Sequence, residues 1–204
     1  MTKPDSHPID DGLKRELIAL YQDGSRHYHG LSHIEALLAL AEEYRAELSD
    51  PDAVGAAIWF HDAIYDSKAK DNEAKSAALA RQRLATRLEP LRLDRVDAMI
   101  LATATHVVPE LDSATALRDA ELFLDMDLSI LGAAPAAFDA YEAAVRAEYA
   151  WVPEPNWTAG RSAVLRSFLG RAHIYHSNEF RNRFEQQARS NIGRSLASLE
   201  EKRS

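Results

Sequence analysis

The sequence contains no cysteine, which excludes a disulfide scaffold, a thiolate zinc site, an iron–sulfur centre and a thiol nucleophile. Glycine and proline are also few, with 8 of each in 204 residues, so the chain is neither collagen-like nor a low-complexity linker. Hydrophobic residues make up 46% and charged residues 27%, which are values of an ordinary globular protein. The composition therefore predicts a folded chain with one sizeable core.

Long hydrophobic runs are absent as well. The longest uncharged run in the second half covers residues 128–138, far short of the roughly 18–20 apolar residues of a membrane-spanning helix. Residues 1–11 are polar and lack the apolar centre of a signal peptide. The sequence therefore predicts a cytoplasmic protein that does not associate with membranes.

Basic charge is in short supply, because 24 Lys and Arg face 32 Asp and Glu, giving a formal net charge of −8. A protein that binds DNA or RNA polymers normally presents a basic face. We therefore expect no nucleic-acid polymer as a partner. A small anionic ligand stays compatible with this charge, since a metal ion or a few arginines reverse its sign locally.

The hydrophobic residues that are present recur with a helical period almost everywhere. Capping signals precede two of the expected helices, at Asp10 and at Asp50-Pro51. Helices are expected over residues 13–21, 34–47, 51–60, 72–89, 93–105, 116–131, 135–149, 158–171 and 178–199, with a connector over 152–157. No segment alternates as a strand does, and no linker divides the chain. The sequence predicts an all-α fold with a single domain over residues 1–204.

The dipeptide His61-Asp62 ends an apolar run over residues 56–60. Because that run should be buried, a carboxylate at its end is costly unless it is paired or bound to a cation. The alternative is a helix-terminal histidine followed by a capping aspartate.

Two further groups combine the residue types that bind divalent metals when thiols are absent. His29 and His33 are spaced for one helix face, although Gly30 between them favours a turn before the helix. Asp125 and Asp127 lie among apolar residues, and on a helix only one of them would face a given site. The alternatives are a polar turn for the histidines and a capping role for the outward aspartate.

The order of a single His, an adjacent His-Asp pair and a distant Asp on separate helices resembles the HD superfamily of metal-dependent phosphohydrolases. Further motifs resemble a bacterial group of predicted HD phosphohydrolases, and the resemblance extends from about residue 21 to residue 192. These motifs are His-Tyr-His-Gly-Leu-Ser-His (27–33), Trp-Phe-His-Asp-Ala-Ile-Tyr-Asp (59–66), Asn-Glu-Ala-Lys-Ser-Ala (72–77), Ala-Thr-Ala-Thr-His (102–106) and Leu-Asp-Met-Asp-Leu-Ser-Ile-Leu-Gly (124–132).

The resemblance implies a helical bundle of the HD type in which His33, His61, Asp62 and Asp127 hold a divalent metal. Asp127 is preferred to Asp125 because its position before Leu matches the final aspartate of the family. Mn²⁺, Fe²⁺, Co²⁺, Ni²⁺ and Mg²⁺ are all candidate ions, and the mixed nitrogen and oxygen ligands favour a transition metal. The implied activity is hydrolysis of a small phosphorylated substrate, such as a phosphomonoester or a nucleotide, by a metal-activated water.

Further residues are expected to assist this hydrolysis. Two carboxylates are candidate bases for the attacking water. Asp66 follows Asp62 by one helical turn and is expected on the same face, and Glu73 is the other candidate. The alarmone hydrolases have a similar stretch, His-Asp-x-x-Glu-Asp, but Tyr65 stands here in place of their Glu. His106 is a candidate proton donor or ligand, with a helix-terminal histidine as the alternative.

Two residues of the first motif region are assigned to the substrate. Arg26 is a candidate phosphate ligand because a guanidinium can bind a phosphate through two donors. His29 is the other candidate substrate-binding residue.

Other functions remain open at this stage. His29 and His106 could be the additional ligands of an HD-type diiron oxygenase, which would hold two irons. A non-catalytic helical protein that binds a metal or a nucleotide is another alternative, and a metal-free bundle is the simplest. The Leu- and Ala-rich helix over residues 74–88 is compatible with a homodimer interface and equally with a core position.

Overall fold

All regular structure in the computed structural model, which describes residues 7–201, is helical. The all-α prediction is therefore confirmed. The helices are α1 (Asp11–Tyr21), α2 (Leu31–Glu43), η1 (Arg45–Glu47), α3 (Pro51–Phe60), α4 (Asn72–Leu84), α5 (Pro90–Ala102), α6 (Ala114–Asp127), η2 (Leu128–Gly132), α7 (Pro135–Glu148), α8 (Glu154–Leu169), α9 (Asn178–Phe180), η3 (Arg181–Glu185) and α10 (Gln186–Glu201).

The chain forms two compact units, the first ending at Met126 and the second beginning at Asp127. The single-domain assignment made from the sequence stays a prediction. Within the described residues, no helix combines the length and apolarity needed to span a membrane. The first six residues lie outside the described part, so the absence of a signal peptide also stays a prediction.

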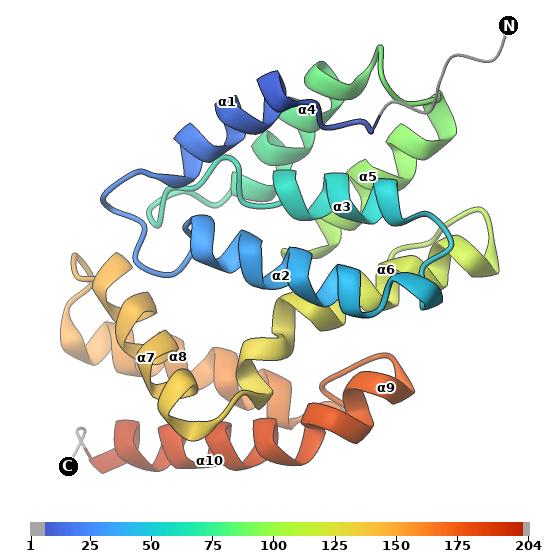
Figure 1. The fold of residues 1–204 in the computed structure, drawn as a ribbon. Coiled ribbons are helices and arrows are strands. Elements are labelled where there is room, and N and C mark those ends of the chain that lie inside the picture. Colours follow the sequence, from blue (N-terminus) through green and yellow to red (C-terminus); the bar gives the residue numbers. More distant parts are fainter. Residues whose placement is uncertain (1–6, 202–204) are drawn as a thin grey trace, which may run out of the picture. The chain divides into compact units, whose positions relative to one another are not determined.

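Helix α3 is the central helix of the first unit. It packs against α2, α4 and α5 (Figure 1). Every residue from Ala53 to Phe60 is buried. A helix that is apolar on all sides has no face for water and therefore occupies the centre of a core. Asp50 caps its N-terminus by accepting a hydrogen bond from the Ala53 amide at 3.1 Å, and Pro51 occupies the first turn, as expected from the sequence.

The second unit is built around α10, which packs against α8, η2 and η3. Asn191, fully buried on α10, donates to the carbonyls of Leu131 and Ala133 at 2.9 and 2.8 Å. These bonds hold the end of η2 and the following turn against the helix.

Several helix boundaries differ from the predicted ones. Helix α5 ends at Ala102 rather than 105, and α6 gives way to the 3-10 helix η2 after Asp127. The expected connector over residues 152–157 is wrong from Glu154 on, because α8 begins there. The first turn of a helix needs no backbone donor at Pro155, so proline fits inside it.

The last predicted helix is also divided. A short α9 is followed by the π-helical η3, and α10 begins only at Gln186.

Candidate metal centre

The end of α3 presents the first two candidate ligands. His61 caps the helix and is buried, and Asp62 follows in the turn with 16% of its side chain exposed. The His61 Nδ1 atom lies 2.9 Å from the carbonyl of Ile58, one turn back in the helix. Because a carbonyl only accepts, Nδ1 carries a proton in this bond, and in the neutral imidazole the lone pair is therefore on Nε2.

The start of α2 presents the third candidate ligand. Gly30 is the N-cap residue of this helix, and His33 lies in its first turn with 4% of its side chain exposed. Since α2 packs against α3, the imidazole of His33 meets that of His61. Their Nε2 atoms are 3.3 Å apart.

The three ligand atoms converge on one point. Asp62 Oδ2 lies 3.0 Å from His61 Nε2 and 3.9 Å from His33 Nε2. Ligands bound at about 2.0–2.2 Å around one ion stand roughly 3–4 Å from one another, so these separations suit a single metal. Among the described residues, His33, His61 and Asp62 form a group that could hold a metal ion.

The surroundings of the group keep Asp62 ionised. Burial raises the pKa of the Asp62 carboxyl. The protonated form of His61, through its charge and its hydrogen bond, together with the charges of His29 and His33, outweighs burial and holds this pKa below its ordinary value. A carboxylate that stays ionised is ready to bind a cation.

Aromatic rings fix the two imidazoles from the side. Phe123 stands edge-on to His61 with ring centroids 5.9 Å apart, and Tyr28 packs against His33 at 4.8 Å. Such packing limits the rotation of each imidazole, so the ligand atoms are oriented before an ion arrives.

The spacing of Asp62 and Asp66 suggested that they share a helix face, but the structure shows that they do not. Helix α3 ends at Phe60, and Asp66 lies exposed in the following turns. Its carboxylate accepts a hydrogen bond from the Lys68 amide at 2.9 Å, while its own amide donates to Asn72 Oδ1 at 3.1 Å. The run after His61 breaks the helix because its polar groups bond within a tight turn instead.

Glu73 lies in the first turn of α4 and is half-buried, which agrees with the predicted helix start. Ser76, one turn further on, joins α4 to the turn that follows Asp62. Its hydroxyl accepts from the Ile64 amide at 3.0 Å and donates to the Ile64 carbonyl at 3.2 Å. The catalytic roles of Asp66 and Glu73 stay predictions.

His106 lies four residues beyond the end of α5 and is half-buried. Its φ of 52° is the left-handed conformation, and its amide donates to the Ala102 carbonyl at 2.8 Å. A non-glycine residue rarely adopts this conformation, which is favoured just after a helix. The expectation of a helix through Thr105 is thus wrong, and the role of His106 stays a prediction.

His29 lies before α2 rather than on it, so it does not share a helix face with His33. It stacks on Tyr65 with ring centroids 4.3 Å apart. Arg26 donates to three backbone carbonyls, those of Asp62, Ala63 and His29. Spacing in the sequence gave no signal of this arrangement, and substrate binding by either residue stays a prediction.

The two acidic residues of α6 differ in burial. Asp125 is fully buried, whereas Asp127 is half-buried at the last position of the helix. Asp127 is also the first residue of the second unit. Its place among the metal ligands stays a prediction from the resemblance.

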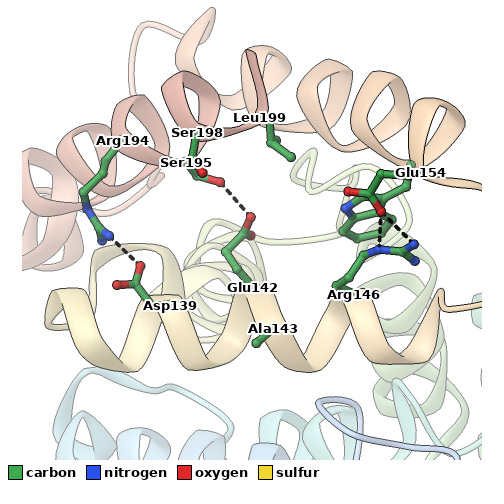
Figure 2. A pocket seen from close by; sticks show the side chains of 10 residues that line it. Asp139, Glu142, Ala143, Arg146, Glu154, Arg194, Ser195, Ser198 and Leu199 are labelled. Carbon is green, nitrogen blue, oxygen red and sulfur yellow. Dashed lines mark hydrogen bonds and ion pairs between the residues drawn. The ribbon is translucent and has the colours of Figure 1, made fainter. Parts of the chain in front are cut away.

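The second unit contains a cavity of about 390 Å³ that the sequence did not indicate. Its charged side chains and Ser195 are paired across it (Figure 2). The pairs are Arg194–Asp139, Arg146–Glu154 and Ser195–Glu142. Glu142 is also bound by the buried Arg161. Such charges look like ordinary solvated helix faces in a sequence, which is why no motif marks the cavity.

Comparison of the chain with protein-family models, curated proteins and solved structures found no match. The geometry of the His33, His61 and Asp62 group is therefore the structural basis for a functional assignment.

Proposed function

We propose that this chain is a metal-dependent phosphohydrolase. The observation that carries the proposal is the convergence of His33 Nε2, His61 Nε2 and Asp62 Oδ2, two imidazoles and a carboxylate from two packed helix ends. The ordered motifs of the HD superfamily add Asp127 as the fourth ligand. Imidazole and carboxylate together favour Mn²⁺, Fe²⁺, Co²⁺ or Ni²⁺ over Mg²⁺.

A divalent cation at such a site supplies Lewis acidity and a water nucleophile at neutral pH. The chain's own residues prepare the site for it. His61 donates a hydrogen bond from Nδ1 to the Ile58 carbonyl, so the Nε2 lone pair of the neutral ring is directed at the site. Asp62 presents a carboxylate oxygen 3.0 Å from that Nε2 atom.

Proton transfer is assigned to the candidate residues identified from the sequence. The carboxylate of Asp66 or Glu73 would take the proton of the attacking water, and His106 would give a proton to the leaving oxygen. The substrate class is a small phosphorylated molecule, such as a phosphomonoester or a nucleotide. This class agrees with a net charge of −8, since only a local site needs to attract the anion.

The first test is the metal content of tag-free protein by mass spectrometry, with D62A and H61A beside the wild type. We expect about one equivalent of a transition metal in the wild type and none in either variant. H27A is the matched control, because His27 is an exposed histidine in the same segment outside the metal group. It should retain the metal and the hydrolysis of a phosphomonoester panel.

Other outcomes would redirect the assignment. Two equivalents of iron with turnover that depends on dioxygen would favour an oxygenase. Tight binding of a nucleotide without hydrolysis would favour a non-catalytic sensor. Failure of the wild type to take up Mn²⁺ or Mg²⁺ after reloading would overturn the metal-dependent mechanism.

A further inference from the structure

Arg26 connects the two chain segments that carry the candidate ligands. Its Nη1 atom donates to the Asp62 carbonyl at 2.6 Å and to the His29 carbonyl at 3.2 Å, and its Nη2 atom donates to the Ala63 carbonyl at 3.0 Å. One guanidinium thus bonds the turn after α3 to the segment that enters α2. Asp62 lies in the turn after α3, and His33 follows His29 by four residues.

Two tyrosines hold this guanidinium in place. Its central carbon lies 5.1 Å from the ring centroid of Tyr21 and 5.7 Å from that of Tyr65, which is within the range of a cation–π interaction. The Tyr21 hydroxyl donates to the Trp59 carbonyl at 3.0 Å, so the end of α1 is fixed to the last turn of α3. Arg26 is therefore bound at both its polar edge and its flat faces.

The turn that Arg26 holds follows the end of α3, and residues 61–71 contain no regular helix. Other parts of it are held by amide bonds that include those from Ala63 to Phe60, from Ile64 to Ser76 and from Asp66 to Asn72. The carbonyls of Asp62 and Ala63 point to Arg26 instead of into a helix. Groups that orient metal ligands in this way commonly change metal affinity by 10–100-fold when they are removed.

We propose that Arg26 is a positioning residue that sets the metal affinity of the group, rather than a phosphate ligand. This inference rests on the proposed function, because it concerns the same metal group. The planar fork of a guanidinium reaches several carbonyls at once, whereas an ammonium reaches them only one or two at a time. Loss of Arg26 should free the Asp62 carboxylate to move away from the imidazoles.

The test measures Mn²⁺ affinity by calorimetric titration and amide hydrogen exchange of residues 61–66 in metal-free protein. For R26Q we expect Mn²⁺ affinity to fall about 10–100-fold and exchange of the turn to rise. R26K keeps part of the packing between the tyrosines and should be intermediate. If R26Q does not fold, R26K decides the outcome.

The matched control is R181Q. Arg181 likewise donates to two backbone carbonyls, those of Tyr175 and His176 at 2.8 and 2.6 Å, but it belongs to the second unit. The R181Q variant should bind Mn²⁺ with an affinity that differs by no more than about twofold from that of the wild type. An equal loss in R181Q would assign the effect to general destabilisation and overturn the proposal.

The alternatives are separated by the same data. Unchanged Mn²⁺ affinity in R26Q with weaker inhibition by inorganic phosphate would make Arg26 a substrate ligand and overturn the positioning role. A wild type that binds no Mn²⁺ would overturn the proposed function. In that case the exchange of residues 61–66 still decides whether Arg26 holds the turn.

Discussion

The two nitrogens of the His61 imidazole have different roles. Nδ1 bonds to the Ile58 carbonyl and belongs to the fold, whereas Nε2 lies beside Asp62 and belongs to the candidate metal group. The first contact lies within the last turn of α3 and its C-cap residue. The group is completed from α2, whose His33 Nε2 lies 3.3 Å from His61 Nε2. A single residue thus couples the end of a buried helix to a site that the helix alone does not contain.

Substitution of a single carboxylate tests which residue is the general base. We expect D66N to retain metal and to lower turnover by about 10²–10⁴-fold if Asp66 is the general base. The substitution preserves the local fold, because the Asn oxygen can accept from the Lys68 amide as Asp66 does. The measurement is steady-state hydrolysis of a phosphomonoester at equal metal loading.

E73Q is the companion variant, since Glu73 is the other candidate base and lies in the first turn of α4. Only the variant of the true base should lose turnover. Normal turnover in D66N with a loss in E73Q would move the base to Glu73. Normal turnover in both would remove both from the mechanism.

The candidate site was partly predictable from single residues. His33, His61 and Asp62 were identified from their types and order, and the structure brings their ligand atoms together. The contacts of Arg26 were not predictable, because its partners are backbone carbonyls, which every residue carries. The shared face of Asp62 and Asp66 was wrong because the helix ends before both residues.

Among the helices, the strongest predictions came from caps and apolar runs. The starts of α3 at Pro51 and of α7 at Pro135 agree with the prediction, because the fixed φ angle of proline suits the first turn of a helix. The ends of α5 and α6 were both placed too late. For α6 the reason is that buried apolar residues, Leu128 and Leu131, continue into the 3-10 helix η2, and a hydrophobic pattern reports burial rather than the type of helix.

One helix contact leads to a stability prediction. A Cβ on Gly132, at the end of η2, would lie 2.6 Å from Phe184 Cβ and 2.7 Å from the Phe184 carbonyl oxygen in η3. Because part of this obstacle is backbone, G132A should lower the free energy of unfolding by about 1–3 kcal/mol. Thermal unfolding followed by circular dichroism measures the change.

G193A is the matched control on α10. A Cβ on Gly193 meets nothing within 4 Å, and the residue is exposed within the helix. Alanine there should raise the free energy of unfolding by up to about 1 kcal/mol through helix propensity. Equal effects of the two substitutions would contradict the close approach of η2 and η3.

For the whole molecule, the question is whether the two units unfold together. The boundary between Met126 and Asp127 falls at the end of α6, and η2 begins at the next residue, so no linker of glycine or proline separates them. The second unit has about 80 residues, a size at which a single core supplies only about 3–5 kcal/mol.

We therefore expect calorimetry of the metal-free chain to show one cooperative transition. Saturation with Mn²⁺ at about 100 times its dissociation constant should add about 2.7 kcal/mol and raise the midpoint by roughly 5–10 °C. Because D62A removes a ligand, its midpoint should not respond to Mn²⁺. Two resolved transitions, only one of which moves with the metal, would instead mean that the units are separate domains and that the ion stabilises one of them alone.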